Sequence, residues 1–299
     1  MKRLSIGLGL FAALAVIGFL GLAAWPISRT PSPSLATLDG NVQNGAYLAR
    51  ASGCIACHTN PEGGAPLAGG IALETPFGTL YSPNLTTDPV HGIGDWTIDQ
   101  FAVAVRQGIS PEGEPYYPAF TYPFYADFSD QDIADLWAAF QTVPPVAEPS
   151  VAPSMMFPFN QRAGLKLWRA AFMHDPDTEP VEGKGDSWNR GKWLVEGATH
   201  CSACHTPRNL AGGRKEETEK FAGSDLIPGG GKAPAIDTSS LKEQGWDADN
   251  LAYALKTGLT PSGDAFGNAM GEVVLHGTQF LSAADLAAMA EYLMDQPRQ

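Results

Sequence analysis

Apolar residues recur at helical spacing in two separate parts of the chain. In the first part, Thr97 and Gln100 have the spacing of a capping box that opens a helix, and Gly108 stands where that helix is expected to end. Ser129 opens a second helix, whose apolar positions follow the i, i+3, i+4, i+7 pattern: Ile133, Leu136, Trp137 and Phe140. This part therefore predicts two amphipathic helices, each with one face in a core.

The second part repeats this plan. Asp247 caps a helix that Gly258 ends, and Ser282 caps the last helix of the chain. Between the two parts, residues 144–187 are rich in proline and include a short amphipathic helix over 165–172. We expect this connector to pack across both parts, because it is too apolar for a free linker. No strand longer than four residues is predicted, so the fold class is expected to be mainly α.

The two parts are also repeats in sequence. Residues 96–120 align without gaps on residues 246–270. A repeat at this distance indicates a duplicated domain, since solenoid repeats have periods of about 20–50 residues. We therefore expect one domain over 39–143 and a second over 188–297, joined by the connector 144–187.

The N-terminus has the pattern of an export segment. Lys2 and Arg3 precede an apolar run over residues 4–25. About 20 apolar residues are enough to span a bilayer, so we expect residues 1–25 to be an uncleaved transmembrane anchor and residues 26–38 to be a tether. The basic end is expected to stay in the cytoplasm. This predicts a protein of the bacterial inner membrane, with everything after the anchor facing the periplasm.

Composition narrows the class of partner. The 299 residues include 19 Lys and Arg against 32 Asp and Glu, a formal net charge of −13. A chain this acidic repels nucleic acid, so we exclude nucleic-acid binding. The same charge favours a protein partner with a basic docking face.

All four cysteines belong to two CxxCH motifs, which are Cys54-Ile55-Ala56-Cys57-His58 and Cys201-Ser202-Ala203-Cys204-His205. This spacing is typical of covalent haem c attachment. The two thiols of a motif reach the two vinyl groups of one porphyrin, and the histidine turns its imidazole toward the iron. We therefore predict two covalently bound haem c groups, with His58 and His205 as iron ligands.

Three other uses of these cysteines fit less well. In a zinc ribbon the two cysteine pairs lie about 15–20 residues apart, whereas Cys57 and Cys201 are separated by 144 positions. A thioredoxin-like redox site needs a βαβ setting, which the pattern lacks. A disulfide framework gives no reason for a histidine after each pair.

Several longer stretches carry a family resemblance. They are TPFGTLYSPNLTTD over 75–88, GIGDW over 92–96, FPFNQR over 157–162 and WNRGKWLVEGATHCSACHTPRN over 188–209. Both halves resemble class I cytochrome c domains. As a whole, residues 39–297 resemble the multihaem cytochrome c subunits of membrane-bound sugar, gluconate and alcohol dehydrogenases. Those subunits have three CxxCH motifs, and this chain has two. The resemblance implies two tandem class I cytochrome c domains behind the anchor.

The resemblance also implies a methionine as the sixth iron ligand of each domain. Met270, 65 residues beyond His205 in a loop rich in Gly and Asn, is the expected ligand in the second domain. In the first domain Phe120 stands at the aligned position, and phenylalanine cannot coordinate iron. The ligand of the first haem is left open between a vacant position and the residues His91, Met155, Met156, His174, Tyr116, Tyr117, Tyr122 and Tyr125. The carbonyl group of Pro207 is expected to hold the His205 ring.

These features favour an electron carrier over an enzyme. The expected role is transfer of electrons from a dehydrogenase to a downstream cytochrome or a terminal oxidase. The alternative is a haem enzyme in which the first haem, without the usual methionine, binds or oxidises a small substrate. A third possibility is a structural subunit whose haems only brace a complex.

Overall fold

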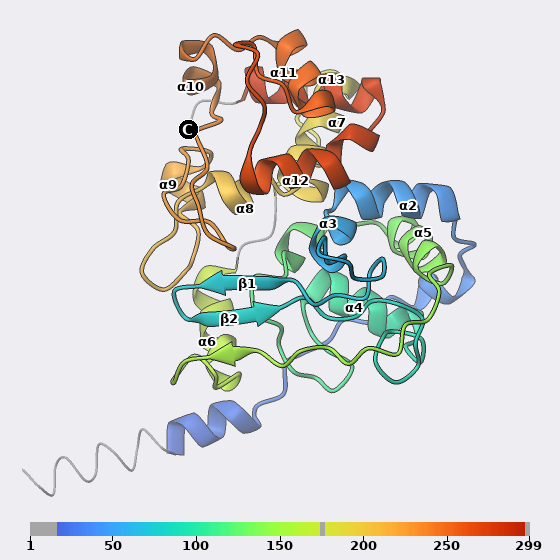
Figure 1. The fold of residues 1–299 in the computed structure, drawn as a ribbon. Helices are drawn as coiled ribbons and strands as arrows, with labels where there is room; N and C mark the ends of the chain where they lie inside the picture. The colour runs from blue at the N-terminus through green and yellow to red at the C-terminus, as the bar shows by residue number, and fades with distance from the viewer. Residues whose placement is uncertain (1–16, 174–176, 297–299) are drawn as a thin grey trace, which may run out of the picture.

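The structure is a computed structural model that describes residues 17–173 and 177–296. Figure 1 shows two lobes, one blue to green and the other yellow-brown to red. The elements of the first lobe, in chain order, are η1 (Pro33–Thr37), α2 (Val42–Ala51), α3 (Cys54–His58), β1 (Ala72–Thr75), β2 (Gly78–Tyr81), α4 (Ile98–Gln107), η2 (Tyr122–Tyr125) and α5 (Asp130–Phe140).

The connector and the second lobe follow. The connector contains β3 (Ser154–Met155) and α6 (Ala163–Phe172). The second lobe contains α7 (Asp186–Trp193), the π-helical turn η3 (Leu194–Ala198), α8 (Ser202–His205), α9 (Glu216–Glu219), α10 (Thr238–Glu243), α11 (Ala248–Thr257), α12 (Asn268–His276), η4 (Thr278–Phe280) and α13 (Ala283–Met294). The described part of the chain is therefore mainly helical.

The four predicted helix starts are confirmed. Thr97 and Ser129 cap α4 and α5, each in a capping box with the residue three positions later. Asp247 does the same for α11, and Ser282 caps α13 by accepting a hydrogen bond from the backbone amide of Asp285. These bonds satisfy amide groups that have no partner inside a helix.

Each lobe packs its first long helix against its last at a glycine. A Cβ atom placed on Gly45 of α2 would lie 1.8 Å from the carbonyl oxygen of Asp135 in α5. One placed on Gly191 of α7 would lie 1.9 Å from the carbonyl oxygen of Ala288 in α13. The two copies of the duplicated domain therefore share the same helix crossing. In each, the two helix backbones lie too close for a side chain at the glycine position.

A small antiparallel sheet joins the connector to the first lobe. Its strand order is β1-β2-β3, with Leu73 opposite Leu80 and Gly78 opposite Met155. In α6, Trp168 Nε1 donates to the carbonyl oxygen of Ala211 in the second lobe at 2.8 Å. On the same helix, Arg169 Nη2 donates to the carbonyl oxygen of Gln107 in the first lobe at 2.8 Å. The prediction that the connector packs across both halves is confirmed.

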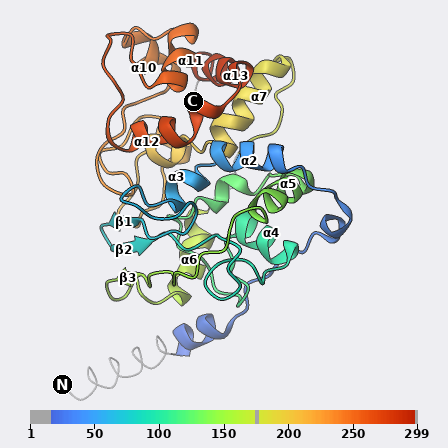
Figure 2. The same cartoon turned by 45° about the vertical axis from the view of Figure 1, so that its right-hand side comes forward.

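The two lobes share one continuous hydrophobic core, which contains buried residues of both. Figure 2 shows α2 on the face of the first lobe that meets the second. There the ring of Phe128 stacks on that of Trp193, with centroids 5.6 Å apart. Tyr47 of α2 donates its hydroxyl hydrogen to Asp285 Oδ2 of α13 at 2.6 Å. The lobes are therefore joined by apolar packing and by a partly buried polar contact.

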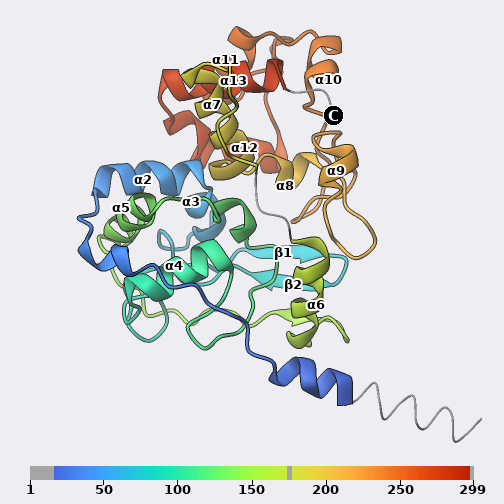
Figure 3. The ribbon, with the colours of Figure 1, turned by 180° about the vertical axis from the view of Figure 1, so that it is seen from behind.

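The segment before α2 lies on the first lobe. Figure 3 shows it crossing the back of that lobe beside α4. Thr30 exchanges two hydrogen bonds with the Gln107 side chain, at 3.0 and 2.7 Å. Arg106 Nη1 donates to Ser32 Oγ at 3.1 Å, and Leu35 is buried.

The N-terminal transmembrane anchor expected over residues 1–25 is wrong for the part of the chain that the structure describes. No helix within residues 17–173 and 177–296 is long and apolar enough to span a bilayer. Residues 1–16 lie outside the described residues. The corrected fold class is a mainly helical protein with a small sheet.

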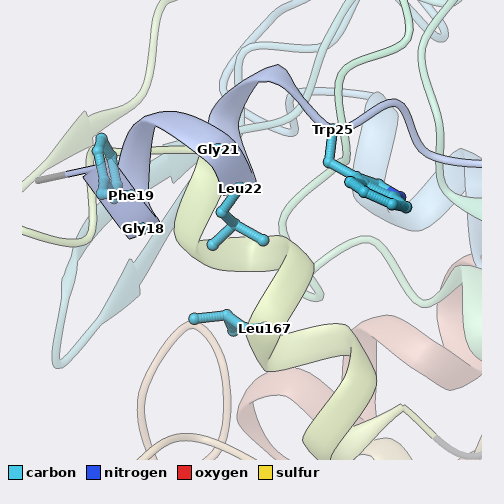
Figure 4. Close-up of a pocket in the computed structure, with 6 residues that line it drawn as sticks. All are labelled: Gly18, Phe19, Gly21, Leu22, Trp25 and Leu167. Carbon is cyan, nitrogen blue, oxygen red and sulfur yellow. The ribbon is translucent and has the colours of Figure 1, made fainter. Parts of the chain in front are cut away.

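The helix over residues 17–24 packs instead against α6 of the connector. Lys166 Nζ donates to the carbonyl oxygens of Leu22 and Ala23, at 3.0 Å each. These carbonyl groups belong to the last turn of that helix, which favours a cation. Figure 4 shows the apolar hollow between the two helices, which is lined by Gly18, Phe19, Gly21, Leu22, Trp25 and Leu167.

Candidate cofactor sites

The first CxxCH motif forms the short helix α3. It begins directly after Gly53, whose φ of +68° allows the chain to turn away from α2. His58 Nδ1 lies 2.8 Å from the carbonyl oxygen of Pro83. Because a carbonyl oxygen only accepts, Nδ1 must carry the hydrogen. The other ring nitrogen, Nε2, is then the one available to a metal.

The second motif repeats this arrangement in α8. His205 Nδ1 lies 2.7 Å from the carbonyl oxygen of Pro234. The prediction that Pro207 holds this ring is wrong, since the Pro207 carbonyl oxygen accepts a hydrogen bond from the backbone amide of Lys215 at 2.9 Å. In both lobes, then, a proline carbonyl from a distant loop sets the same histidine tautomer.

The thiols and imidazoles lie in enclosed surroundings. Burial raises the pKa of Cys54 to about 12 and that of Cys201 to about 11. It lowers the pKa of His58 to about 4, so the ring is neutral, as an iron ligand must be. Cys57 is open to solvent, yet burial also raises the pKa of its thiol. Of the four thiols, that of Cys57 is the most accessible to solvent.

The four cysteine thiols are also free to form thioether bonds. All four are free thiols, with no disulfide between them. Among the described residues, no group of three or more His, Cys, Asp or Glu side chains comes together as a metal site. Each motif offers two thiols and one free imidazole nitrogen, the set that covalent haem c requires.

Two arginines beside the second motif were missed by the sequence analysis. Arg208 donates to the carbonyl oxygens of Ala203 at 2.6 Å and Gly212 at 3.3 Å. Burial and the neighbouring charge of Arg214 lower the pKa of Arg208 to about 10. Arg214 is paired with Glu216, and Arg208 is a cation that suits the carboxylate of a haem propionate. The sequence did contain a signal for this site, since a basic residue, Arg208, stands three positions after the predicted iron ligand His205.

Met270 lies in the first turn of α12 and not in an open loop. Its side chain is partly buried against the core. The helix α12 packs against α11 and also against α3, the helix of the first motif. Figure 1 shows α12 at the boundary between the lobes. Ligation of the second iron by Met270 stays a prediction.

Phe120 lies in a cluster of aromatic rings. Its ring centroid is 5.8 Å from that of Tyr116, 5.9 Å from that of Tyr122 and 6.2 Å from that of Tyr125. The hydroxyl of Tyr125 is already engaged, because it donates to the carbonyl oxygen of Ser52 at 2.8 Å. Burial raises the pKa of Tyr116 to about 12. The cluster thus surrounds the position where the resemblance implies a methionine.

The other candidate ligands of the first iron lie in different places. Tyr117 donates its hydroxyl hydrogen to the carbonyl oxygen of Phe159 at 2.9 Å. His91 is in the loop before α4, Met155 is on β3, and Met156 is 55% exposed. His174 lies outside the described residues. The sixth ligand of the first iron therefore stays open.

No family model matches the chain. It is similar to a dihaem c-type cytochrome of Cereibacter sphaeroides, with 38% identity over 300 residues that cover 96% of this chain and 98% of that protein. It is also similar to the fructose dehydrogenase cytochrome subunit of Gluconobacter japonicus, with 39% identity over 277 residues and 89% of this chain covered. A third relative is the cytochrome c subunit of the quinone-dependent alcohol dehydrogenase of Gluconacetobacter polyoxogenes, with 38% identity over 284 residues and 92% of this chain covered. The matches span 54% and 59% of these two subunits.

Proposed function

The chain belongs to the family of the dihaem c-type cytochromes and dehydrogenase cytochrome c subunits, and from this we propose that it is an electron-transfer protein with two covalently bound haem c groups. The resemblance read from the sequence is thereby confirmed. Each haem, when bound, takes up and releases one electron. The protein itself would attach, orient and enclose the two haem groups.

The observation that carries the proposal is the repeated pairing of a motif histidine with a proline carbonyl. His58 with Pro83 and His205 with Pro234 both leave Nε2 free on a neutral, enclosed ring. A carbonyl partner fixes the ring orientation and makes the imidazole a better iron ligand. In this proposal the four thiols supply the thioether attachments, two for each haem.

The proposed donor is a dehydrogenase, and the proposed acceptor is a downstream cytochrome or a terminal oxidase. Relatives named as dehydrogenase cytochrome subunits support the donor. The net charge of −13 supports docking on a basic face, with an association rate that falls as salt rises. We place the two lobes in the periplasm, which the basic then apolar N-terminal pattern supports. Cell fractionation tests this placement.

Intact mass spectrometry and redox titration test the cofactor assignment. The protein should carry the mass of two haems under denaturing conditions and should titrate reversibly with one electron per haem. In Cys204→Ala one thioether is lost, so incorporation of haem at the second motif should weaken or fail, while Cys54 and Cys57 keep the first haem. A Cys204→Ala protein with two covalent haems and an unchanged spectrum contradicts the assignment.

The aromatic cluster at Phe120 favours a second candidate function, a haem enzyme at the first site. If no side chain fills the sixth position there, a small ligand can bind the iron. Carbon monoxide added to the reduced protein distinguishes the two. An electron carrier with both irons fully ligated keeps its spectrum, whereas an open first site shifts the Soret band of half the haem.

A further inference from the structure

His200 lies where the two motifs approach each other. It directly precedes Cys201, and its Nε2 lies 3.3 Å from the carbonyl oxygen of Ser52 in the first lobe. A Cβ atom placed on Gly53, the residue directly before Cys54, would lie 3.5 Å from the same nitrogen. The residues that precede the first cysteine of each motif are therefore in contact across the boundary between the lobes.

This contact is closely supported on the first-lobe side. The His200 ring packs 5.9 Å from the Phe124 ring and 6.0 Å from the Tyr125 ring, centroid to centroid. The Ser52 carbonyl oxygen also accepts a hydrogen bond from the Tyr125 hydroxyl. This single carbonyl group is therefore held from both lobes, and the His200 ring nitrogen that faces it must be the donor.

The backbone of His200 also indicates a specific role. Its φ is +41°, in the left-handed region that residues other than glycine seldom adopt. Such a conformation costs free energy and persists only where the surroundings hold it. Here the surroundings are the Ser52 carbonyl and the two aromatic rings. The strained turn aims the imidazole across the boundary, and directly after it the chain enters the second motif.

We propose that His200 is a positioning residue that fixes the separation of the two haem-attachment motifs, and with it the rate of electron exchange between them. This rests on the proposed function. In the exchange, the ferrous iron of one site loses one electron and becomes ferric, and the ferric iron of the other site gains it and becomes ferrous. No proton moves and no bond forms. Because electron tunnelling slows steeply with distance, a contact beside both attachment points controls the rate directly.

The experiment follows how fast an electron equilibrates between the two haems after a light pulse has reduced one of them. His200→Ala removes the contact with the Ser52 carbonyl and should slow this step relative to the wild type. His200→Gln keeps a donor for the Ser52 carbonyl and should recover most of the rate. His276→Ala is the matched control, since His276 pairs with Glu272 on its own helix at 3.1 Å, and its rate should be unchanged.

Two further measurements distinguish a change in the separation of the two haems from a change in the iron ligands. The midpoint potentials should be the same in all four proteins, because no iron ligand is changed. The magnetic coupling between the two oxidised irons should be present in the wild type and weaker in His200→Ala. The coupling in the wild type can be measured without any variant, so its absence would overturn the proposal even if His200→Ala failed to fold.

Other results would also count against this role. An unchanged exchange rate in His200→Ala, or a wild-type rate that rises with protein concentration, would overturn it. Both leave the electron-carrier function standing, provided that the two haems titrate reversibly. A wild-type protein without covalent haem would instead refute the proposed function itself.

Discussion

At the scale of single residues, Tyr47 connects the two lobes through its hydroxyl group. It donates to Asp285 Oδ2 at 2.6 Å and accepts from the backbone amide of Ser282 at 3.0 Å. Arg190 donates to both carboxylate oxygens of Asp285, at 2.9 Å each. Burial alone would raise the pKa of Asp285, but the hydrogen bonds from Arg190 and Tyr47 outweigh it and hold that pKa below its usual value.

We expect Tyr47→Phe to lower the free energy of unfolding by about 1.5–3 kcal/mol, the usual loss for a hydrogen bond to a charged group. The ring remains, so apolar packing is unchanged and the loss reports the hydroxyl alone. Urea denaturation measures it. Tyr253→Phe is the control, because Tyr253 is 56% exposed and should lose almost nothing. Equal stability of the two variants would show that the link contributes nothing.

At the scale of elements, one added residue distinguishes the two repeats. Gly45 precedes Cys54 by nine positions, and Gly191 precedes Cys201 by ten. The second lobe accommodates the extra residue as the π-helical turn η3. Such turns arise where one residue more must fit into a helix, and they are frequent at functional sites. His200 follows this turn.

The helix crossings at Gly45 and Gly191 predict a large effect of a single methyl group. Gly45→Ala and Gly191→Ala place a Cβ atom about 2 Å from a carbonyl oxygen of the facing helix, so the helices must separate. Each variant should lose about 1–3 kcal/mol or more of folding free energy, as measured by denaturant unfolding.

The matched control for these crossings is Gly164→Ala on α6. No atom lies within 4 Å of the added Cβ atom there. This variant should be neutral or more stable by about 0.5–1 kcal/mol, because alanine is the better helix former. If all three substitutions had the same effect, helix propensity and not close packing would explain the result.

At the scale of the whole molecule, the two lobes share one core but differ at one position in the electron path. Both proposed irons have a histidine held by a proline carbonyl, while Phe120 aligns with Met270. A methionine ligand raises the potential of a haem that is bound by histidine. With a His, Tyr or vacant sixth position, the first haem should then have the lower potential. Electrons would enter there and leave through the second.

Redox titration of Met270→Ala tests this polarity. The wild type should show two waves, and the substitution should lower only the upper one, because only the second iron loses its thioether ligand. A single wave in the wild type, or an unaffected upper wave in the variant, would contradict it. Met155→Ala and Met156→Ala serve as comparisons. If either residue ligates the first iron, the wild-type potentials converge and replacing that residue separates them.

The local features of this protein could be predicted from its sequence. The caps at Thr97, Ser129, Asp247 and Ser282 form within three or four residues, so a short stretch contains both partners of each hydrogen bond. The same holds for the CxxCH motifs, whose spacing alone indicates the cofactor, and for the repeat, which is visible without any contact. That residues 17–24 pack against α6 of the connector could not be predicted, because hydropathy does not identify the partner of an apolar segment.

Only the tertiary structure decided which distant residues meet. The carbonyl that holds His205 belongs to Pro234, 29 positions away, and not to nearby Pro207. The partner of His200 lies 148 positions away at Ser52, and that of Tyr47 lies 238 positions away at Asp285. Hydrogen bonds within a turn depend on spacing along the chain, which the sequence states directly. Contacts between the lobes depend on how the two lobes pack against each other, and that arrangement is the combined result of many weak contacts that no single motif records.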